Sequence, residues 1–353
     1  MSHPSPAATI ETVTEDRDRD IKAVDLIGVV AIGRNEGERL RCCLQSIQNC
    51  NAVVYVDSNS SDDSVALAKQ FGVEVVELDM SQPFSAARAR NEGFARLMET
   101  FPATKYVQFV DGDCEMSDGW LQRARDEFGK DPKLAVVGGR IRERYPDQSL
   151  YNRLCDIEWN TPIGDAKSVG GNAVMRTDVV QSMGGYNPTV IAGEEPELCV
   201  RIRADGWKIR RIDAEMARHD AAITRFKQWW RRMQRSGHAY AQGAMMHGGA
   251  PEFHWVRETR SICFWGCVVP VIALLLAWPT WGLSLGLFAG YAALIRRVGR
   301  YYRGRGFSKT DSRLAAIFDV LAKFPQFVGV VVFRMNHLRS KNTELIEYKG
   351  ATS

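Results

Sequence analysis

The chain has 353 residues, enough for one large domain or two of modest size. Hydrophobic residues make up 45% and charged residues 25%, an ordinary globular balance that excludes global disorder and fibrous repeats. The formal net charge is only +4, too small a surplus to indicate nucleic acid as a partner. A mean hydropathy of −0.24 excludes a polytopic transporter and leaves room for one local membrane segment.

The predicted elements follow a charge-dense lead-in, residues 1–22, which has little to bury and is predicted to be disordered. Apolar runs at 27–32, 52–56, 73–78 and 106–110 then alternate with helical patterns at 36–49, 62–71 and 85–98. Strands separated by helices are typical of βαβ units. The sequence therefore predicts an α/β domain, residues 23–222, with a mostly parallel sheet flanked by helices.

Polar residues collect where the predicted strands end. Asn35 and Glu36 follow the first strand, Asp57 ends the second, and Asp111-Gly112-Asp113 follows the fourth. Ligands of open parallel sheets bind at the carboxyl ends of the strands. One acidic strand end would mean little, because Asp and Ser there also cap the next helix. Three such ends at one edge predict a ligand site.

The sharpest local signal is Asp111-Gly112-Asp113. Two carboxylates one residue apart on a turn can face one divalent cation, with phosphate oxygens completing its shell. The alternative is a solvated turn, but the apolar strand before it and the other acidic strand ends favour the metal. Arg88 and Arg90 on a neighbouring helix would offset diphosphate charge, unless they are simply solvated.

Two later segments carry further candidate residues. Gly171 would let the backbone approach a sugar closely, and the amide of Asn172 would read a hydroxyl. Glu194 and Glu195 open a predicted helix. Paired carboxylates at a helix start are either charges favoured by the helix dipole or a general base whose pKa a like-charged neighbour holds high. Both interpretations stay open here.

The composition changes toward the C-terminus. Residues 223–255 include FKQWWRRMQR, a basic amphipathic helix suited to an anionic headgroup layer; packing on the catalytic domain is the alternative. Residues 261–295 contain no charged side chain, and one straight helix of that length would measure roughly 50 Å, against a hydrocarbon core of about 30 Å. With Trp278-Pro279-Thr280-Trp281 at its middle, this run predicts a transmembrane or re-entrant helical hairpin; a buried core hairpin is the alternative.

Arginines flank this run on both sides, and residues 296–353 are predicted to be a basic, amphipathic cytoplasmic tail. Positive charge marks the cytoplasmic side of a membrane segment, so the large N-terminal region is expected to face the cytoplasm at the cytoplasmic membrane.

Taken in order, the motifs resemble the family-2 glycosyltransferases, inverting enzymes of the Rossmann-like GT-A fold that use nucleotide-sugar donors. The likeness covers residues 29–220 and rests on VAIGRNEGERL, VYVDSNSSDDS, ARNEGF, VDGDCEM, GGNAVMR, GGYNP and GEEPELCVRIR. The resemblance implies that the donor nucleotide is bound by Ile32, Arg34, Asn35, Glu36, Asp57, Arg90, Asn91, Asp111, Gly171 and Asn172.

The resemblance also implies the metal and the base. Asp113, with Asp111 nearby, would hold Mg²⁺ or Mn²⁺ on the diphosphate, and His219 lies where some relatives place a late ligand. A lone His is more often a structural residue. The family most often has Asp after Glu as its base; here that position is Glu195, and Glu194 stays an alternative.

The function implied is a metal-dependent inverting glycosyltransferase of the hexosyltransferase class, acting on a lipid-linked glycan at the membrane surface in cell-envelope or exopolysaccharide synthesis. Three alternatives compete. A nucleotidyltransferase would favour a first loop rich in Gly, Arg and Lys, and a processive polysaccharide synthase would need more membrane helices. A non-catalytic nucleotide-binding membrane scaffold fits poorly with an intact set of Asp57, Asp111, Asp113 and Glu195.

Overall fold

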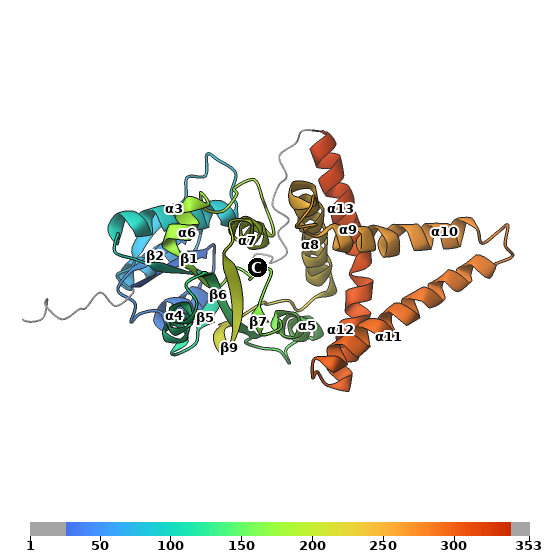
Figure 1. Ribbon diagram of the computed structural model, residues 1–353, viewed down its shortest axis with the longest axis horizontal. Coiled ribbons are helices and arrows are strands. Elements are labelled where there is room, and N and C mark those ends of the chain that lie inside the picture. Colours follow the sequence, from blue (N-terminus) through green and yellow to red (C-terminus); the bar gives the residue numbers. More distant parts are fainter. Residues whose placement is uncertain (1–25, 340–353) are drawn as a thin grey trace, which may run out of the picture.

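The computed structural model describes residues 26–339; the predicted lead-in at 1–22 lies outside them. A nine-stranded sheet forms the centre, with strand order β3-β2-β1-β4-β8-β6-β9-β5 and with β7 also paired to β9 (Figure 1). The strands are β1 (Ile27–Gly33), β2 (Val53–Asp57), β3 (Glu74–Glu77), β4 (Tyr106–Asp111), β5 (Cys114–Met116), β6 (Leu134–Glu143), β7 (Gly164–Asp165), β8 (Ala173–Arg176) and β9 (Lys208–His219).

The α/β sheet flanked by helices is confirmed, and β1 to β4 are the four predicted strands. They pair in parallel, in the order β3-β2-β1-β4. Beyond them the sheet is mixed rather than mostly parallel, because β8 runs antiparallel to β4 and β6, whereas β6 and β9 are parallel. The apolar-run pattern predicted no strand after residue 110, so it held no information on the direction of these later strands.

Helices cover both faces of the sheet. One face is covered by α1 (Glu38–Ser46), α2 (Ser64–Gln70) and α4 (Trp120–Lys130), and the other by α3 (Ala86–Thr100), α6 (Thr177–Ser182) and α7 (Glu194–Ala204). The predicted apolar face of α1 is buried, with Leu40, Cys43 and Leu44 at most 1% exposed. On α3, a Cβ at Gly93 would lie only 2.5 Å from Val30, so glycine lets this helix sit close to the sheet.

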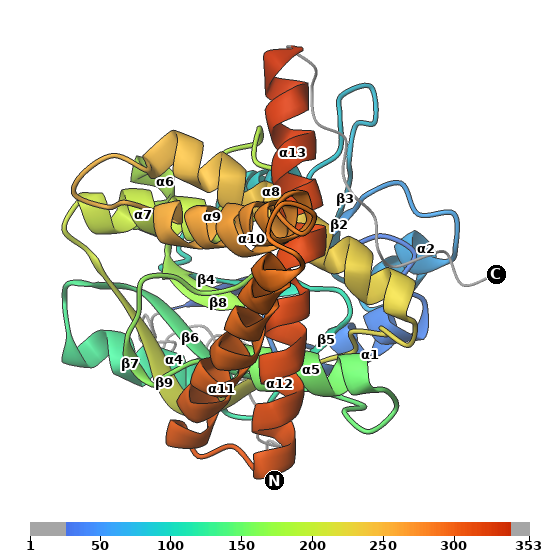
Figure 2. The ribbon, with the colours of Figure 1, turned by 90° about the vertical axis from the view of Figure 1, so that its right-hand side faces the viewer.

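The remaining helices lie on the side of the sheet that faces the viewer in Figure 2. They are α5 (Leu150–Trp159), α8 (Phe226–His247), α9 (Val256–Cys263), the π-helix η1 (Phe264–Val268), α10 (Val269–Leu275), the 3₁₀-helix η2 (Leu283–Phe288), α11 (Ala289–Gly304), α12 (Lys309–Leu321) and α13 (Lys323–Leu338). Of these, α10, η2 and α11 project outward from that side. Two glycines bring α8 and α13 together: a Cβ at Gly237 would meet the carbonyl oxygen of Gln326 at 2.0 Å, and one at Gly329 that of Gln234 at the same distance.

The apolar face of α8 packs inside the protein, which was the alternative to the predicted headgroup layer. Trp229 is 3% exposed, and its ring packs against Tyr151 of α5 and Phe318 of α12. An ion pair between Arg153 and Asp311 also links α5 to α12. The interior of a protein and a membrane both remove such a face from water, so its amphipathic pattern alone did not distinguish them.

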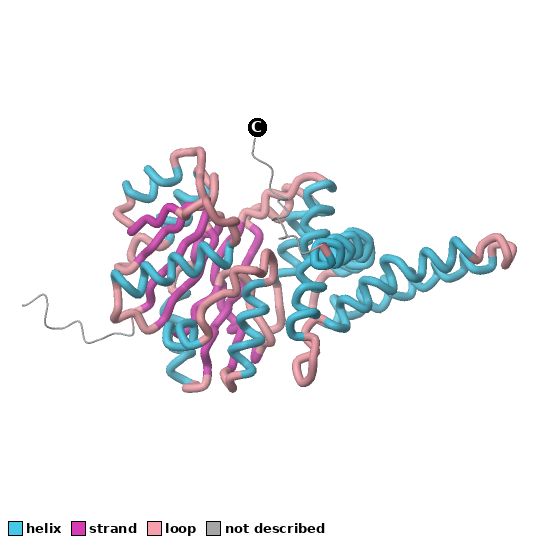
Figure 3. Tube along the Cα trace, turned by 90° about the horizontal axis from the view of Figure 1, so that it is seen from above, coloured by secondary structure: helices cyan, strands magenta, loops and turns pink. Residues whose placement is uncertain are grey.

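The hairpin predicted over residues 261–295 is formed by α10, η2 and α11, and it projects away from the rest of the molecule (Figure 3). The side chains at its tip are exposed to solvent: Trp278 is 93% exposed and Trp281 98%. Two helical segments are long and apolar enough to cross a membrane by length and composition, Val256–Leu275 and Lys309–Leu338. The second lies within the predicted basic, amphipathic tail.

Candidate active site

The carboxyl ends of β1, β2 and β4 lie side by side at one edge of the sheet. In the pairing register Gly33 lies opposite Asp57, and Ile32 lies opposite both Val56 and Asp111. The strand order β2-β1-β4 therefore brings the three polar loops together, and their predicted convergence is confirmed.

The loops after β1 and β2 are tied to each other. The backbone N–H of Asn35 donates to Oγ of Ser60 at 2.9 Å, and the Asn35 side-chain oxygen accepts from the N–H of Ser61 at 2.7 Å. Asp57 is 2% exposed and accepts from the Tyr55 hydroxyl and from the backbone of Ser60. Asp57 thus fixes the shape of this rim, and the predicted nucleotide residues Arg34 and Asn35 are exposed on it.

A single buried guanidinium joins the aspartate motif to the paired glutamates. Arg90 of α3 is 3% exposed. Its Nη2 lies 2.8 Å from Oδ1 of Asp111 at the end of β4, and its Nη1 lies 2.8 Å from Oε1 of Glu194 and 2.7 Å from Oε1 of Glu195 at the start of α7. Burial acts to lower the pKa of Arg90, but these carboxylates outweigh it and raise that pKa well above its ordinary value.

Glu195 has the electrostatic setting of a general base. It is 8% exposed, and α7 begins directly after Gly193, whose φ of 84° is left-handed. Burial raises the pKa of Glu195 to about 7; the adjacent Glu194 adds to this, and Arg90 opposes it. A carboxyl group that titrates near neutrality can both accept and release a proton at physiological pH.

The Gly171–Asn172 loop reaches the carboxylates. A Cβ at Gly171 would lie 2.6 Å from Nη2 of Arg90, 3.0 Å from Oδ2 of Asp111 and 3.2 Å from Oε1 of Glu195. Asn172 is buried and accepts a hydrogen bond from the backbone of Asp111 at 3.1 Å. The absent side chain of Gly171 therefore leaves backbone alone facing the three charged groups.

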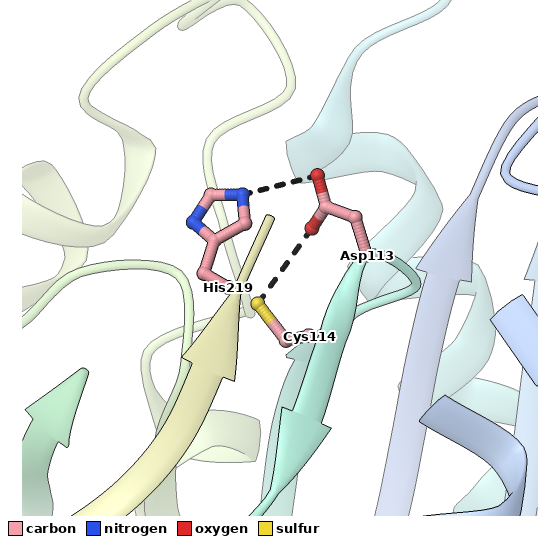
Figure 4. Close-up of side chains that lie close together, drawn as sticks. All are labelled: Asp113, Cys114 and His219. Atoms are coloured by element: carbon pink, nitrogen blue, oxygen red, sulfur yellow. Dashed lines mark hydrogen bonds and ion pairs between the residues drawn. The ribbon is translucent and has the colours of Figure 1, made fainter. Parts of the chain in front are cut away.

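The second aspartate of the metal motif forms its own cluster (Figure 4). Nε2 of His219, at the end of β9, lies 3.0 Å from Oδ2 of Asp113, and the Cys114 thiol donates to Oδ1 of Asp113. Ligand atoms of these three residues lie within 4.8 Å of one another. Oxygen and nitrogen suit a hard divalent ion, so Asp113 and His219 fit Mg²⁺ or Mn²⁺. Cys114 does not, because burial raises the pKa of its thiol.

Some predicted residues lie elsewhere in this region. Asn91 accepts from the backbone N–H of Tyr186 and donates to its carbonyl, both at 2.8 Å, and so holds the GGYNP loop. Ile32 is buried in β1, where its carbonyl accepts from Gly112 at 2.8 Å. Glu36 pairs with Arg39 on the next turn. The structure thus places Asn91 and Ile32 behind the site, supporting its loops.

Two aromatic residues were not singled out from the sequence. The ring of Trp159 stacks on His219, with centroids 4.6 Å apart and planes 16° apart. Tyr186 lies under the Arg90 guanidinium at 5.6 Å. The GGYNP motif offered a signal for Tyr186; Trp159 ends α5 without any motif, and only the fold brings it to the site.

Comparison with known proteins relates this site to one family. Residues 29–179 match the family model described as Glycosyl transferase family 2. The chain is similar to the pre-mycofactocin glycosyltransferase of Mycobacterium tuberculosis, at 27% identity over 238 residues, which covers 63% of this chain and 48% of that protein. It is also similar to glycosyltransferase AglE of Haloferax volcanii, at 24% identity over 199 residues, covering 52% of this chain and 63% of AglE.

The chain thus spans about half the length of the first of these relatives. Among solved structures it is similar to mannosyltransferase PcManGT from Pyrobaculum calidifontis, in complex with GDP-Man and Mn²⁺. The identity is 18% and the TM-score 0.52, with 89% of this chain and 87% of that one covered, a likeness of fold alone. The sequence match thus identifies residues 29–179 as a glycosyltransferase family 2 domain, and the structural likeness agrees with a GT-A-like fold.

Proposed function

We propose that the protein is an inverting glycosyltransferase that moves a sugar from a nucleoside-diphosphate sugar to an acceptor hydroxyl. The observation that carries this proposal is the contact of Arg90 with both Asp111 and Glu195. Through this contact the predicted donor-binding strand end and the predicted base come together beside the backbone of Gly171. The family 2 domain and the glycosyltransferases among its relatives support the same reaction class.

In this proposal Glu195 accepts the proton of the acceptor hydroxyl, whose oxygen attacks the anomeric carbon as the nucleoside diphosphate leaves. Glu194 shares Nη1 of Arg90 with Glu195. Two features favour Glu195 as the base: its pKa is raised to about 7, and its Oε1 is the oxygen of the pair beside Gly171. Arg90 fixes the direction of the Glu195 carboxylate, and Glu194 helps to keep its pKa high.

Asp113 and His219, with Asp111 at the end of β4, would hold the divalent cation. The fit rests on their donor atoms and on charge, because Asp111, Glu194 and Glu195 share the single positive charge of Arg90, and Asp113 pairs with His219. When bound, Mg²⁺ or Mn²⁺ supplies positive charge that stabilises the leaving diphosphate. Trp159 stacks on the His219 ring and limits its rotation.

We further propose that the α10–α11 hairpin enters a bilayer from its cytoplasmic side. Its apolar arms, residues 261–277 and 282–295, measure about 26 Å and about 21–24 Å, short of a hydrocarbon core of about 30 Å. Such arms favour re-entry over crossing. The exposed Trp278 and Trp281 form the tip, and Arg296 and Arg297 follow the second arm at headgroup level.

The direction in which the hairpin points determines how the second apolar segment, Lys309–Leu338, would lie relative to the membrane. Helices α12 and α13 run crosswise to α10 and α11 (Figure 1), so with the hairpin inserted they would lie along the membrane surface. The burial of the two apolar segments agrees with this placement. In Lys309–Leu338, 44% of the most apolar 18-residue stretch is buried inside the protein, against 17% in Val256–Leu275. A catalytic domain held at this surface suits a lipid-linked glycan acceptor, which is the acceptor class we propose.

The test compares two isosteric variants, Glu195→Gln and Glu194→Gln, in mild detergent with a panel of nucleotide sugars. Release of nucleoside diphosphate is measured with water as acceptor, and donor binding is measured by calorimetry. Loss of a general base reduces turnover by about 10²–10⁴-fold, and we expect this for Glu195→Gln with donor binding retained. Unchanged turnover in Glu195→Gln would remove the assignment, and a loss confined to Glu194→Gln would transfer it to Glu194.

A further inference from the structure

A pocket of about 300 Å³ lies between β6, β9 and the end of α5. It shares no lining residue with the candidate active site. Four arginines line it, Arg123, Arg140, Arg142 and Arg211, against two acidic residues, Asp213 and Glu215. Positive charge therefore predominates in a concave site that the proposed reaction does not use.

Arg211 is the group that this pocket leaves unsatisfied. Arg211 is only 5% exposed, and its Nε has no hydrogen-bond partner among residues 26–339. Burial lowers the pKa of Arg211; Asp213 opposes this effect, and Arg305 adds to it. A buried guanidinium without a full set of acceptors is costly unless a ligand supplies them.

The neighbouring arginines are held in place by the fold. Nη2 of Arg140 lies 3.0 Å from Asp156 of α5, and Nε of Arg142 lies 3.0 Å from Glu215 of β9. The pairing of β6 with β9 is irregular on both sides of Arg140, which lies opposite Glu215. Even so, burial lowers the pKa of Arg140; Asp156 counters this effect, and Arg142 and Arg211 reinforce it. The acids beside the pocket therefore compensate its positive charge only in part.

The pocket lies at the junction between the sheet and the C-terminal helices. Arg305, just after α11, donates to the carbonyl oxygen of Asn160, which itself lines the pocket. The arginines Arg296, Arg297, Arg300 and Arg303 are exposed along α11 itself. An anion in the pocket would thus sit beside the part of the molecule that we place at the membrane.

We infer that this arginine pocket binds a phosphate group. A phosphate monoester or diester offers several acceptor oxygens on one centre, which matches guanidinium forks arriving from both β6 and β9. Its charge would offset the excess of arginine over acid, and its oxygens would accept from the guanidinium of Arg211, which lines the pocket. The phosphate belongs either to a soluble compound or to a phospholipid headgroup.

The test uses the full chain in detergent, without divalent metal and at constant ionic strength. Melting temperature is followed against inorganic phosphate and pyrophosphate, with chloride as reference. In parallel, flotation compares vesicles of phosphatidylcholine with vesicles that also contain phosphatidylglycerol. Two variants change the pocket, Arg211→Gln and Arg123→Gln. Arg123 is exposed, so its replacement tests the pocket without disturbing the core. Arg96→Gln on α3 is the matched control.

Loss of one charge-assisted hydrogen-bond donor is expected to weaken anion binding at least about tenfold in both pocket variants and not in Arg96→Gln. Stabilisation by phosphate or pyrophosphate that both pocket variants lose identifies a soluble ligand. A preference for phosphatidylglycerol that both lose, without an effect of phosphate, identifies a headgroup. We also expect Arg211→Gln to melt no lower than the parent protein without anion, since it removes a repelled charge.

The proposal fails if neither anion nor anionic vesicles produce a response that Arg123→Gln and Arg211→Gln weaken. It also fails if Arg96→Gln weakens the response equally, because the effect would then be general surface charge.

Discussion

Replacing Arg90 by Met tests how the site is held together. The side chain is 3% exposed and contacts Asp111, Glu194 and Glu195, all within 2.8 Å. Methionine keeps much of the volume and removes the charge, which leaves three carboxyl groups facing one another. Removal of one partner from a buried ion pair costs about 3–5 kcal/mol. At about 2–4 °C per kcal/mol, the melting temperature should fall by roughly 6–20 °C at pH 8.

The loss should shrink as the pH falls toward 5. Glu195 already has a raised pKa of about 7, and without Arg90 it binds its proton more tightly, so protonation relieves the repulsion. The control is Arg88→Met on the same helix, whose guanidinium donates to the carbonyl of Gln82 and whose loss should stay within about 0.5 kcal/mol. Thermal melting of both variants at pH 8 and pH 5 is the assay. A loss below about 1 kcal/mol in Arg90→Met, or one independent of pH, would refute this reasoning.

Three further predictions follow from the same geometry. Donor hydrolysis should rise as the pH passes about 7, because Glu195 then becomes ionised. The contribution of Glu195 to stability is fully present below its unfolded pKa of about 4.5 and should decline as the pH rises through its folded pKa of about 7. A rate that stays flat from about pH 5 to pH 8 would contradict the assignment of Glu195 as the base. Gly171→Ala should displace Arg90 and destabilise the protein by about 1–3 kcal/mol in thermal melts, while Gly170→Ala, which meets nothing within 4 Å, should be neutral; equal effects would remove the crowding argument. The double variant Trp278→Ser, Trp281→Ser should weaken vesicle binding at least about tenfold in flotation, and the exposed Tyr145→Ser on the sheet domain should not; unchanged binding would exclude the hairpin tip as the anchor.

The sequence predicted the first half of the sheet well because β1, β2 and β4 are buried apolar runs bounded by turn residues. It missed β6 and β9 because their strands carry charged residues, such as Arg140 and Arg142 in β6 and Arg210 in β9. Those residues break the apolar pattern, and they are neutralised only by partners far away in the chain, such as Asp156 and Glu127.

At the site, the sequence indicated the residue types, and the fold determined their partners. Arg90 was predicted to meet diphosphate, yet it already binds three carboxyl groups that lie 21 to 105 positions further along the chain. The stacking of Trp159 on His219 has no local signature, since the two residues come from α5 and β9. Such contacts depend on tertiary packing, which periodicity and spacing do not encode.

The central claim is that the chain binds a nucleotide sugar through a metal held at Asp113 and transfers its sugar. The most direct measurement is release of nucleoside diphosphate from a panel of nucleotide sugars, with Mn²⁺, Mg²⁺ or chelator, by the parent protein and by Asp113→Asn. We expect release from one donor that requires the metal and is lost in Asp113→Asn, with Asp118→Asn on the nearby turn as control. The account would be contradicted if no nucleotide sugar in the panel bound to the protein or released nucleoside diphosphate with either metal present.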